Sequence, residues 1–329
     1  MSHDYIYAGT SAYAHLQKLL TETERELLLG SADYDSFLDA LQSTFFGTLL
    51  DPHDPKNISV ALDTALIDAK HTIERIAPTP LLFSFVWLQY DFYNLKILLK
   101  KSAQQATDEG ERDSFIPLGS YSLEKLTKAV QTDAFSSLNL YLARAVREAK
   151  KNTHTSLDTG MDKHYLEAAL ALAGQVRDPF VSEYVRIQID LFNLRANLRN
   201  KAAPQDGAPE GPVVFVRGGS IPPANLEKTE DILVRLSHFG GDALWKDAVT
   251  TFRNTGDFTL IDKAADDYRM RWLKQKSIDL HSPAPLFAYF ANVIENVQFV
   301  RAVATAKYVG LSEKILRDLV RTSFSSYVY

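Results

Sequence analysis

The stretch PLLFSFVWLQYDFYNLKILLKK, residues 80–101, decides how the rest of the chain is interpreted. Its apolar residues recur at alternating spacings of four and three, which places them on one face of a helix. These stripe positions are Leu81, Phe85, Leu88, Phe92, Leu95 and Leu99. Thr79 is a typical N-cap residue, and proline is favoured at the first helical position because its missing N–H would have no intrahelical partner. The stretch therefore predicts an amphipathic helix that begins at Pro80.

The same pattern occurs twice more along the chain. The second copy begins with Asp178 and Pro179, and its stripe positions are Phe180, Tyr184, Ile187, Leu191, Leu194 and Leu198. The third copy begins at Pro285, and its stripe positions are Leu286, Phe290, Val293, Val297, Val300 and Ala304. Three helices rarely agree by chance in proline, stripe and a following basic residue. We therefore interpret the chain as a threefold internal repeat.

Polar residues also recur at matching positions of these helices. They are Asp91, Asn94 and Lys96 in the first copy, Asp190, Asn193 and Arg195 in the second, and Arg301 in the third. Acid and base are five residues apart, so they point about 140° from each other and do not pair within one helix. Two interpretations remain open: the side chains are solvated or hydrogen-bonded locally, or acid and base pair between modules, as g and e positions do across a coiled-coil seam.

The flanking segments correspond as well. Asp63 and Asp162 each lie 17 residues before their prolines, whereas Asp262 lies 23 before its own, which implies an insertion of six residues. The segments FIPLGSYSLEKL and VFVRGGSIPPANLEKT follow the first two helices and share a glycine turn and Leu-Glu-Lys. A period near 100 residues is too long for a standard solenoid. We therefore expect three similar helical modules, residues 1–120, 121–222 and 223–329, closed into one body.

Helical periodicity dominates the remaining sequence, and the predicted fold class is all-α. Helices are expected at residues 11–29, 33–47, 58–76, 80–104, 121–150, 158–176, 179–201, 223–238, 258–276, 286–309 and 311–322. Residues 212–216 are the best candidate for a short extended piece. The polar, Gly/Pro/Ala-containing stretches 102–114 and 202–212 are expected to be loops.

Composition is typical of a globular protein and gives no electrostatic case for nucleic-acid binding. The 329 residues are 46% hydrophobic and 23% charged, with a net charge of −5 and no cysteine. Without cysteine there is neither a disulfide framework nor a thiolate metal site. The N-terminus lacks the basic and apolar regions of a signal peptide, and polar residues interrupt the longest apolar stretch. We expect a soluble protein without a membrane span.

Motifs for catalysis or cofactor binding are scarce, so we expect no cofactor. The sequence has no GxxxxGK[ST] loop for nucleotide phosphates and no GxSxG elbow for a nucleophile. His71/Glu74 and His164/Glu167 have helical spacing suited to a metal, but surface or core histidines explain them better. Asp266-Asp267 is interpreted as a solvated helix face. Catalytic groups can still converge from distant positions, so an all-helical enzyme remains an alternative.

The sequence resembles the C subunit of the A/V-type ATPases, the counterpart of the d subunit of the eukaryotic vacuolar enzyme. The resemblance lies in the helices D91FYNLK and D190LFNLR, the FVRGGSI turn and the ending VRAVATAKYVGLS, and it covers nearly the whole chain. In the third copy, Asn296 and Phe299 stand where the pattern has Asp and Asn. This departure concerns the polar role of that copy rather than membership of the family.

The resemblance implies a funnel-shaped, all-helical protein of three modules in pseudo-threefold arrangement. It implies a non-catalytic socket of the central stalk, on the cytoplasmic face of the membrane. The implied partners are the rotor-shaft subunits of the D and F type and the membrane-embedded rotor ring. Two other classes remain open. One is a helical enzyme with a central cavity, which nucleotide hydrolysis by the isolated chain would favour, and the other is a generic helical scaffold that binds peptides or helices.

Overall fold

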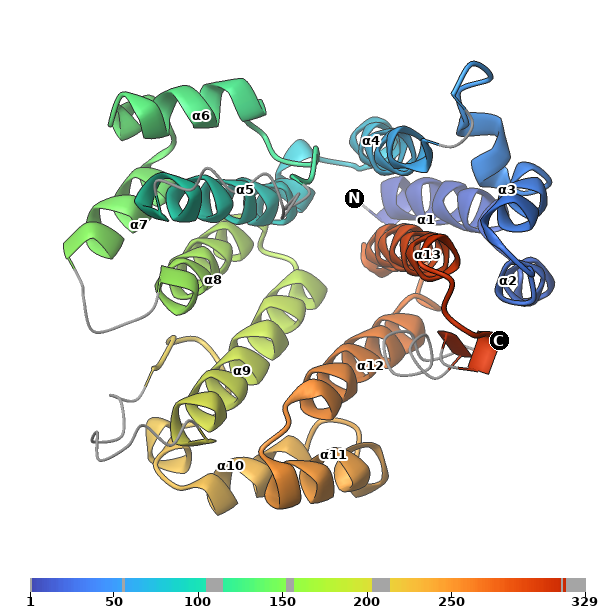
Figure 1. Cartoon of the computed structure of the whole chain (residues 1–329). Helices are drawn as coiled ribbons and strands as arrows, with labels where there is room; N and C mark the ends of the chain where they lie inside the picture. The colour runs from blue at the N-terminus through green and yellow to red at the C-terminus, as the bar shows by residue number, and fades with distance from the viewer. Residues whose placement is uncertain are drawn as a thin grey trace. The chain divides into compact units, whose positions relative to one another are not determined.

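The computed structural model describes residues 2–54, 57–104, 115–151, 157–202, 214–314 and 316–317. All regular structure in these residues is helical, which confirms the all-α class. The chain divides into two compact units (Figure 1). One unit contains residues 1–78 and 259–329, so it combines both ends of the chain, and the other contains residues 79–258. The threefold repeat is a finer level of description and remains a prediction.

The unit formed by the two chain ends is built around its last long helix. Its helices are α1 (Ser2–Leu16), α2 (Glu22–Leu29), α3 (Tyr34–Gln42), the 3-10 helix η1 (Phe45–Leu49), α4 (Ile58–Ile76), α12 (Thr259–Lys276) and α13 (Ala284–Tyr308). Helix α13 packs against α1, α4, α12 and α3 (Figure 1). Seventeen of its 25 residues are buried, so this copy of the repeated helix is a core helix covered on most sides.

The second unit, residues 79–258, is arranged around helix α8 (Leu157–Val176). This helix packs against α5 (Ser84–Gln104), α7 (Leu140–Lys151) and α9 (Pro179–Ala202) (Figure 1). The remaining elements of the unit are η2 (Pro80–Phe83), α6 (Leu123–Gln131), η3 (Phe135–Ser137), η4 (Pro223–Leu226), α10 (Thr229–Leu236) and α11 (Asp242–Thr255). Helices α5 and α9 carry the first two copies of the repeated pattern.

The repeated helices begin where the sequence predicts. Pro80 is the first residue of η2, which leads directly into α5; Pro179 is the first residue of α9, and Pro285 the second residue of α13. The Thr79 hydroxyl accepts the N–H of Leu81 at 3.3 Å, as an N-cap residue does. All eighteen stripe positions are buried except three that are half-buried, namely Leu81, Leu99 and Tyr184. The predicted apolar face is therefore the face that packs.

Several helix boundaries differ from the sequence prediction. The expected helix 11–29 is divided into two helices, because Thr21 and Glu24 form a capping box that starts α2. The Glu24 N–H donates to the Thr21 hydroxyl at 3.3 Å, and the Thr21 N–H donates to the Glu24 carboxylate at 2.7 Å. The expected helix 121–150 is likewise divided into α6, η3 and α7, and α11 was not predicted. Half of the expected helix 311–322, residues 315 and 318–322, lies outside the described residues.

Candidate functional site

The repeated Asp and Asn of α9 bind the backbone of the segment that follows the helix. Asp190 is 1% exposed, and its two carboxylate oxygens accept both the N–H of Ser220, at 2.8 and 3.0 Å, and the Ser220 hydroxyl at 2.7 Å. The N–H of Ile221 donates to the same carboxylate at 3.1 Å. One turn further on, the Asn193 side chain accepts the Val216 N–H at 2.8 Å and donates to the Val216 carbonyl at 2.9 Å. We call this arrangement the clamp.

Helix α5 carries the same clamp. Asp91 is fully buried and accepts the N–H of Tyr121 at 3.0 Å. Asn94 accepts the N–H of Ile116 at 3.0 Å and donates to the carbonyl of that residue at 2.8 Å. The sequence repeat of Asp-x-x-Asn therefore corresponds to a repeat of structure: each pair holds the glycine turn that follows its own helix. Of the two interpretations, local hydrogen bonding describes these side chains.

An additional asparagine extends the second clamp. Asn197 lies one helical turn beyond Asn193; its side chain accepts the Val214 N–H at 2.9 Å and donates to the Val214 carbonyl at 2.6 Å. Residues 214–216 form no strand, yet alternate residues of this extended segment pair with side-chain amides as they would pair with a neighbouring strand. Sequence reasoning missed Asn197 because the first repeat has Leu98 at the matching position.

The glycine of each turn allows the loop to approach the carboxylate. A β-carbon on Gly219 would lie 2.1 Å from Oδ1 of Asp190, and one on Gly119 would lie 2.2 Å from Oδ1 of Asp91. Both distances are far below a van der Waals contact, so any side chain there would displace the buried carboxylate. The shared glycine of the two segments is thus required by the clamp.

The third repeated helix, α13, also binds a backbone N–H through a buried polar side chain, but in a segment that precedes the helix in the chain. Asn296 occupies the position of the acid on α13, and its side-chain oxygen accepts the N–H of Leu20 at 3.1 Å. Its neighbour Glu295 forms a two-pronged ion pair with Arg25, at 2.8 and 2.5 Å. The Arg25 guanidinium also lies 4.9 Å from the centre of the Phe299 ring, the residue that replaces the repeated Asn. In this copy the N-terminal part of the chain is therefore the segment that the helix binds.

Two of the repeated basic residues pair with the acids that precede the repeated helices. Lys96 lies 2.9 Å from Asp162 and 3.5 Å from Asp158, both on α8. Arg301 lies 3.7 Å from Asp63 on α4. Lys96 and Arg301 therefore pair with acids other than the predicted Asp91 and Asp190. Each of these two bases does contact a carboxylate from another predicted module. Arg195 lies half-buried on α9.

The local environment shifts the pKa of two of these acids in opposite directions. Burial raises the pKa of Asp63, and the longer contact with Arg301 opposes this only in part. Burial also raises the pKa of Asp158, but the hydrogen bond from Lys100 and the charge of Lys96 outweigh it, so the net shift is downward. Lys100 lies 2.7 Å from the Asp158 carboxylate. The α5–α8 contact is therefore the more favourable of the two charged contacts.

Of the histidines considered as metal ligands, His164 contacts two carboxylates. His164 lies between Glu148, 3.2 Å from Nε2, and Glu167, 3.3 Å from Nδ1. The two carboxylates thus contact opposite nitrogens of the ring, which suits an ion pair rather than a shared metal ion. In the part of the chain that the structure describes, no group of three His, Asp or Glu side chains is arranged to hold a metal.

A known protein family matches almost the whole chain. The family described as "ATP synthase (C/AC39) subunit" matches residues 10–319, a span that includes all three repeated helices and both clamps. The chain belongs to this family. The resemblance to the C subunit of A/V-type ATPases rests on the order and repetition of weak motifs. The family match supports it because it spans almost the entire sequence.

Individual members of the C/AC39 family are distant but align along most of their length. The C subunit of the A-type ATP synthase of Methanobrevibacter smithii is 23% identical over 93% of this chain and 84% of its own length. The equivalent protein of Methanosarcina acetivorans is 23% identical over 96% of this chain and 92% of its own. The C subunit of the V-type sodium ATPase of Enterococcus hirae is 23% identical over 83% of this chain and 84% of its own length. Members of both A-type and V-type complexes are thus similar to this chain.

In the described residues, the helices of this C/AC39 family member are shorter or more polar than membrane-spanning helices. None of those in the described residues combines the length and the apolar run that crossing a bilayer requires. The Asp190 and Asn193 side chains are buried and bonded to backbone groups, so the clamp holds the following segment to its helix.

Proposed function

We propose that this chain is the non-catalytic socket of the central stalk in a rotary A/V-type ATPase. In this role it joins the rotor-shaft subunits, of the D and F type, to the membrane-embedded rotor ring, and so couples ATP turnover to the transport of H⁺ or Na⁺. It lies on the cytoplasmic face of the membrane as a peripheral part of the complex. The observation that carries the proposal is the family match over residues 10–319.

The clamps support this role physically. An adapter that transmits torque must not deform between its two contact faces, and loops are normally the most compliant parts of a helical protein. Here the turns at Gly119 and Gly219 are fixed to α5 and α9 by buried Asp and Asn side chains. Each turn is thereby held to the helix it follows, which suits a mechanical coupling element.

The proposal is tested by removing the chain from the complex. Membrane vesicles of the parent organism, with the gene deleted, are expected to lose the ATP-driven ion uptake of wild-type vesicles, H⁺ or Na⁺, each followed with its own dye. The catalytic head should still hydrolyse ATP. Adding the purified chain back should restore uptake. The proposal is wrong if ATP-driven uptake persists without the chain. Vigorous ATP hydrolysis by the purified chain alone would instead support the helical-enzyme alternative.

A further inference from the structure

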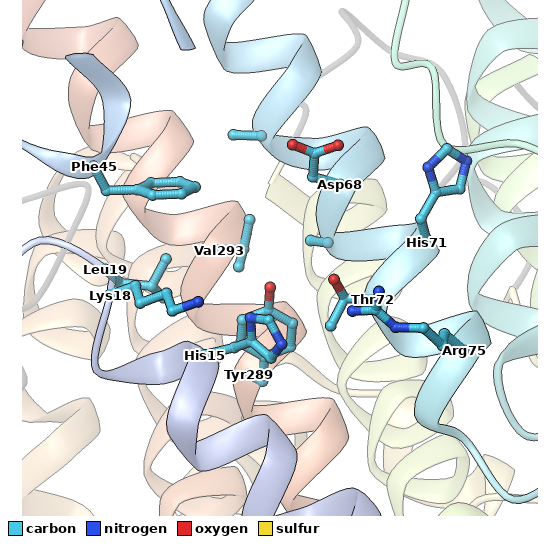
Figure 2. Close-up of a pocket in the computed structure, with 12 residues that line it drawn as sticks. His15, Lys18, Leu19, Phe45, Asp68, His71, Thr72, Arg75, Tyr289 and Val293 are labelled. Atoms are coloured by element: carbon cyan, nitrogen blue, oxygen red, sulfur yellow. The ribbon is translucent and has the colours of Figure 1, made fainter. Parts of the chain in front are cut away.

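A pocket of about 340 Å³ lies within the unit formed by the two chain ends (Figure 2). Its walls come from α4 and α13, from η1, and from the end of α1 with the residues that follow it. One part of the lining is apolar and includes Leu19, Phe45 and Val293. A volume of this size is within the range of sites for small organic molecules. The pocket belongs to neither clamp.

The polar part of the lining is rich in cations. Lys18 reaches it from the segment that follows α1 and Arg75 from α4, together with the imidazoles of His15 and His71. Asp68 is the acidic residue of the lining. Within the described part of the chain, neither Lys18 nor Arg75 forms an ion pair. Two cations that share a concave site with a single carboxylate leave an excess of positive charge, which favours an anionic occupant.

The hydroxyl groups of the pocket add neutral donors beside these cations. Figure 2 shows the Tyr289 and Thr72 side chains near the centre of the pocket, with Lys18 and Arg75 extending toward them from opposite sides. Burial, reinforced by Asp68, raises the pKa of Tyr289 to about 12. Tyr289 therefore keeps its proton at neutral pH and is a hydrogen-bond donor.

The charge state of His15 is consistent with this positive environment. Its ring lies 5.7 Å from the Tyr289 ring, centre to centre. Burial lowers the pKa of His15, and the charges of Lys18 and Arg75 lower it further. At neutral pH the imidazole is thus predominantly uncharged, and Lys18 and Arg75 are the main positive charges that an anion would meet.

We propose that this pocket binds a small organic oxyanion, a carboxylate or a phosphate monoester with a compact apolar body. The oxyanion would lie between Lys18 and Arg75 and accept a hydrogen bond from Tyr289, while the apolar body would lie against Phe45 and Val293. The combination of charged donors at one end and apolar side chains at the other distinguishes such a ligand from an inorganic ion.

Isothermal titration calorimetry of the purified full chain at low ionic strength tests the proposal, with benzoate and phenyl phosphate as anionic probes and benzamide as the neutral match of benzoate. Both anions are expected to bind at least tenfold more tightly than benzamide. Arg75→Gln and Lys18→Gln should each weaken anion binding about tenfold or more, since a hydrogen bond to a charged group is lost. Tyr289→Phe should weaken it less and leave benzamide unaffected.

Arg186→Gln and Lys128→Gln are the matched controls, because they change the same charge on exposed residues of the other unit. They should leave anion binding unchanged. Circular dichroism spectra identical to wild type establish that each variant is folded. The proposal is overturned if the anions bind no better than benzamide, or if the control variants weaken binding as much as the pocket variants. A second pair of results also overturns it: the wild-type chain binds none of the probes, and the folded Arg75→Gln chain fails to join the ATPase complex. The cations would then serve a partner protein.

Discussion

Replacing Gly219 by alanine is the sharpest perturbation of the clamp, because it adds a single methyl group where the structure leaves no room. The new β-carbon would lie 2.1 Å from Oδ1 of Asp190 and 2.9 Å from its Cγ. An ordinary contact begins near 3.4 Å, so either the carboxylate or the turn must move by more than 1 Å. The atom that must move is buried and accepts N–H groups from Ser220 and Ile221.

The expected loss of stability follows from those hydrogen bonds. Bonds to charged groups contribute about 1.5–3 kcal/mol each, and moving Oδ1 by this distance breaks or lengthens two of them. Partial relaxation of the turn recovers some of this, so we expect Gly219→Ala to lower the free energy of unfolding by about 2–4 kcal/mol. Gly174→Ala is the control: its β-carbon meets nothing within 4 Å, and the change should stabilise helix α8 by about 0.5–1 kcal/mol.

Urea denaturation followed by circular dichroism measures both effects, and hydrogen exchange of the Ser220 and Ile221 amides reports the clamp directly. A double-mutant cycle isolates the contact: once Asp190→Ala has removed the carboxylate, Gly219→Ala should have an effect below about 1 kcal/mol. The reasoning is refuted if Gly219→Ala is as mild as the Gly174→Ala control, or if its effect is the same with and without the carboxylate of Asp190.

Other contacts give predictions of different kinds. Asn193→Leu keeps the branched shape of the side chain but leaves the N–H and the carbonyl of Val216 unpaired. We expect a loss of about 2–4 kcal/mol by urea denaturation and faster amide exchange at Val216. Arg25→Met leaves the nearly buried Glu295 carboxylate without its partner and should lower stability by about 3–5 kcal/mol, which the additional change Glu295→Met should largely restore. Because the folded-state pKa of Asp158 is lowered, its charge stabilises the fold above the unfolded pKa and this is lost as the pH falls, so Asp158→Asn should destabilise at pH 7 and match wild type in acid. The raised pKa of Asp63 has the opposite sign: stability falls as pH rises between its unfolded and folded values, and Asp63→Asn should remove that fall in a pH series of unfolding curves.

The repeated helices were predictable because their signals are local. The proline, the cap and the apolar stripe all depend on residues within a few turns of one another, and the structure places Pro80, Pro179 and Pro285 at helix starts as expected. The break before α2 was also present in the sequence as Thr21 and Glu24, a capping-box pair inside an apparently continuous helical pattern. Local signals thus define most of the elements.

The role of the repeated acids was not predictable in the same way. The sequence shows that Asp91 and Asp190 recur, but their partners are backbone N–H groups thirty residues later, which no side-chain pattern reveals. A coiled-coil register suggested charge pairing because it considers only side chains on parallel helices. The shared glycine, Gly119 and Gly219, was the available clue: a turn that repeats together with a buried acid indicates close approach of backbone to that acid.

The most direct test of the proposed coupling role is the composition of the complex that contains the chain. The protein, tagged at its native locus, would be purified from gently solubilised membranes and its partners identified and quantified by mass spectrometry. The account predicts that the catalytic-head, rotor-shaft and membrane-ring subunits of one A/V-type ATPase co-purify with it in constant ratio. It is contradicted if the chain is recovered without them while the same membranes yield a complete, ion-pumping ATPase that lacks it.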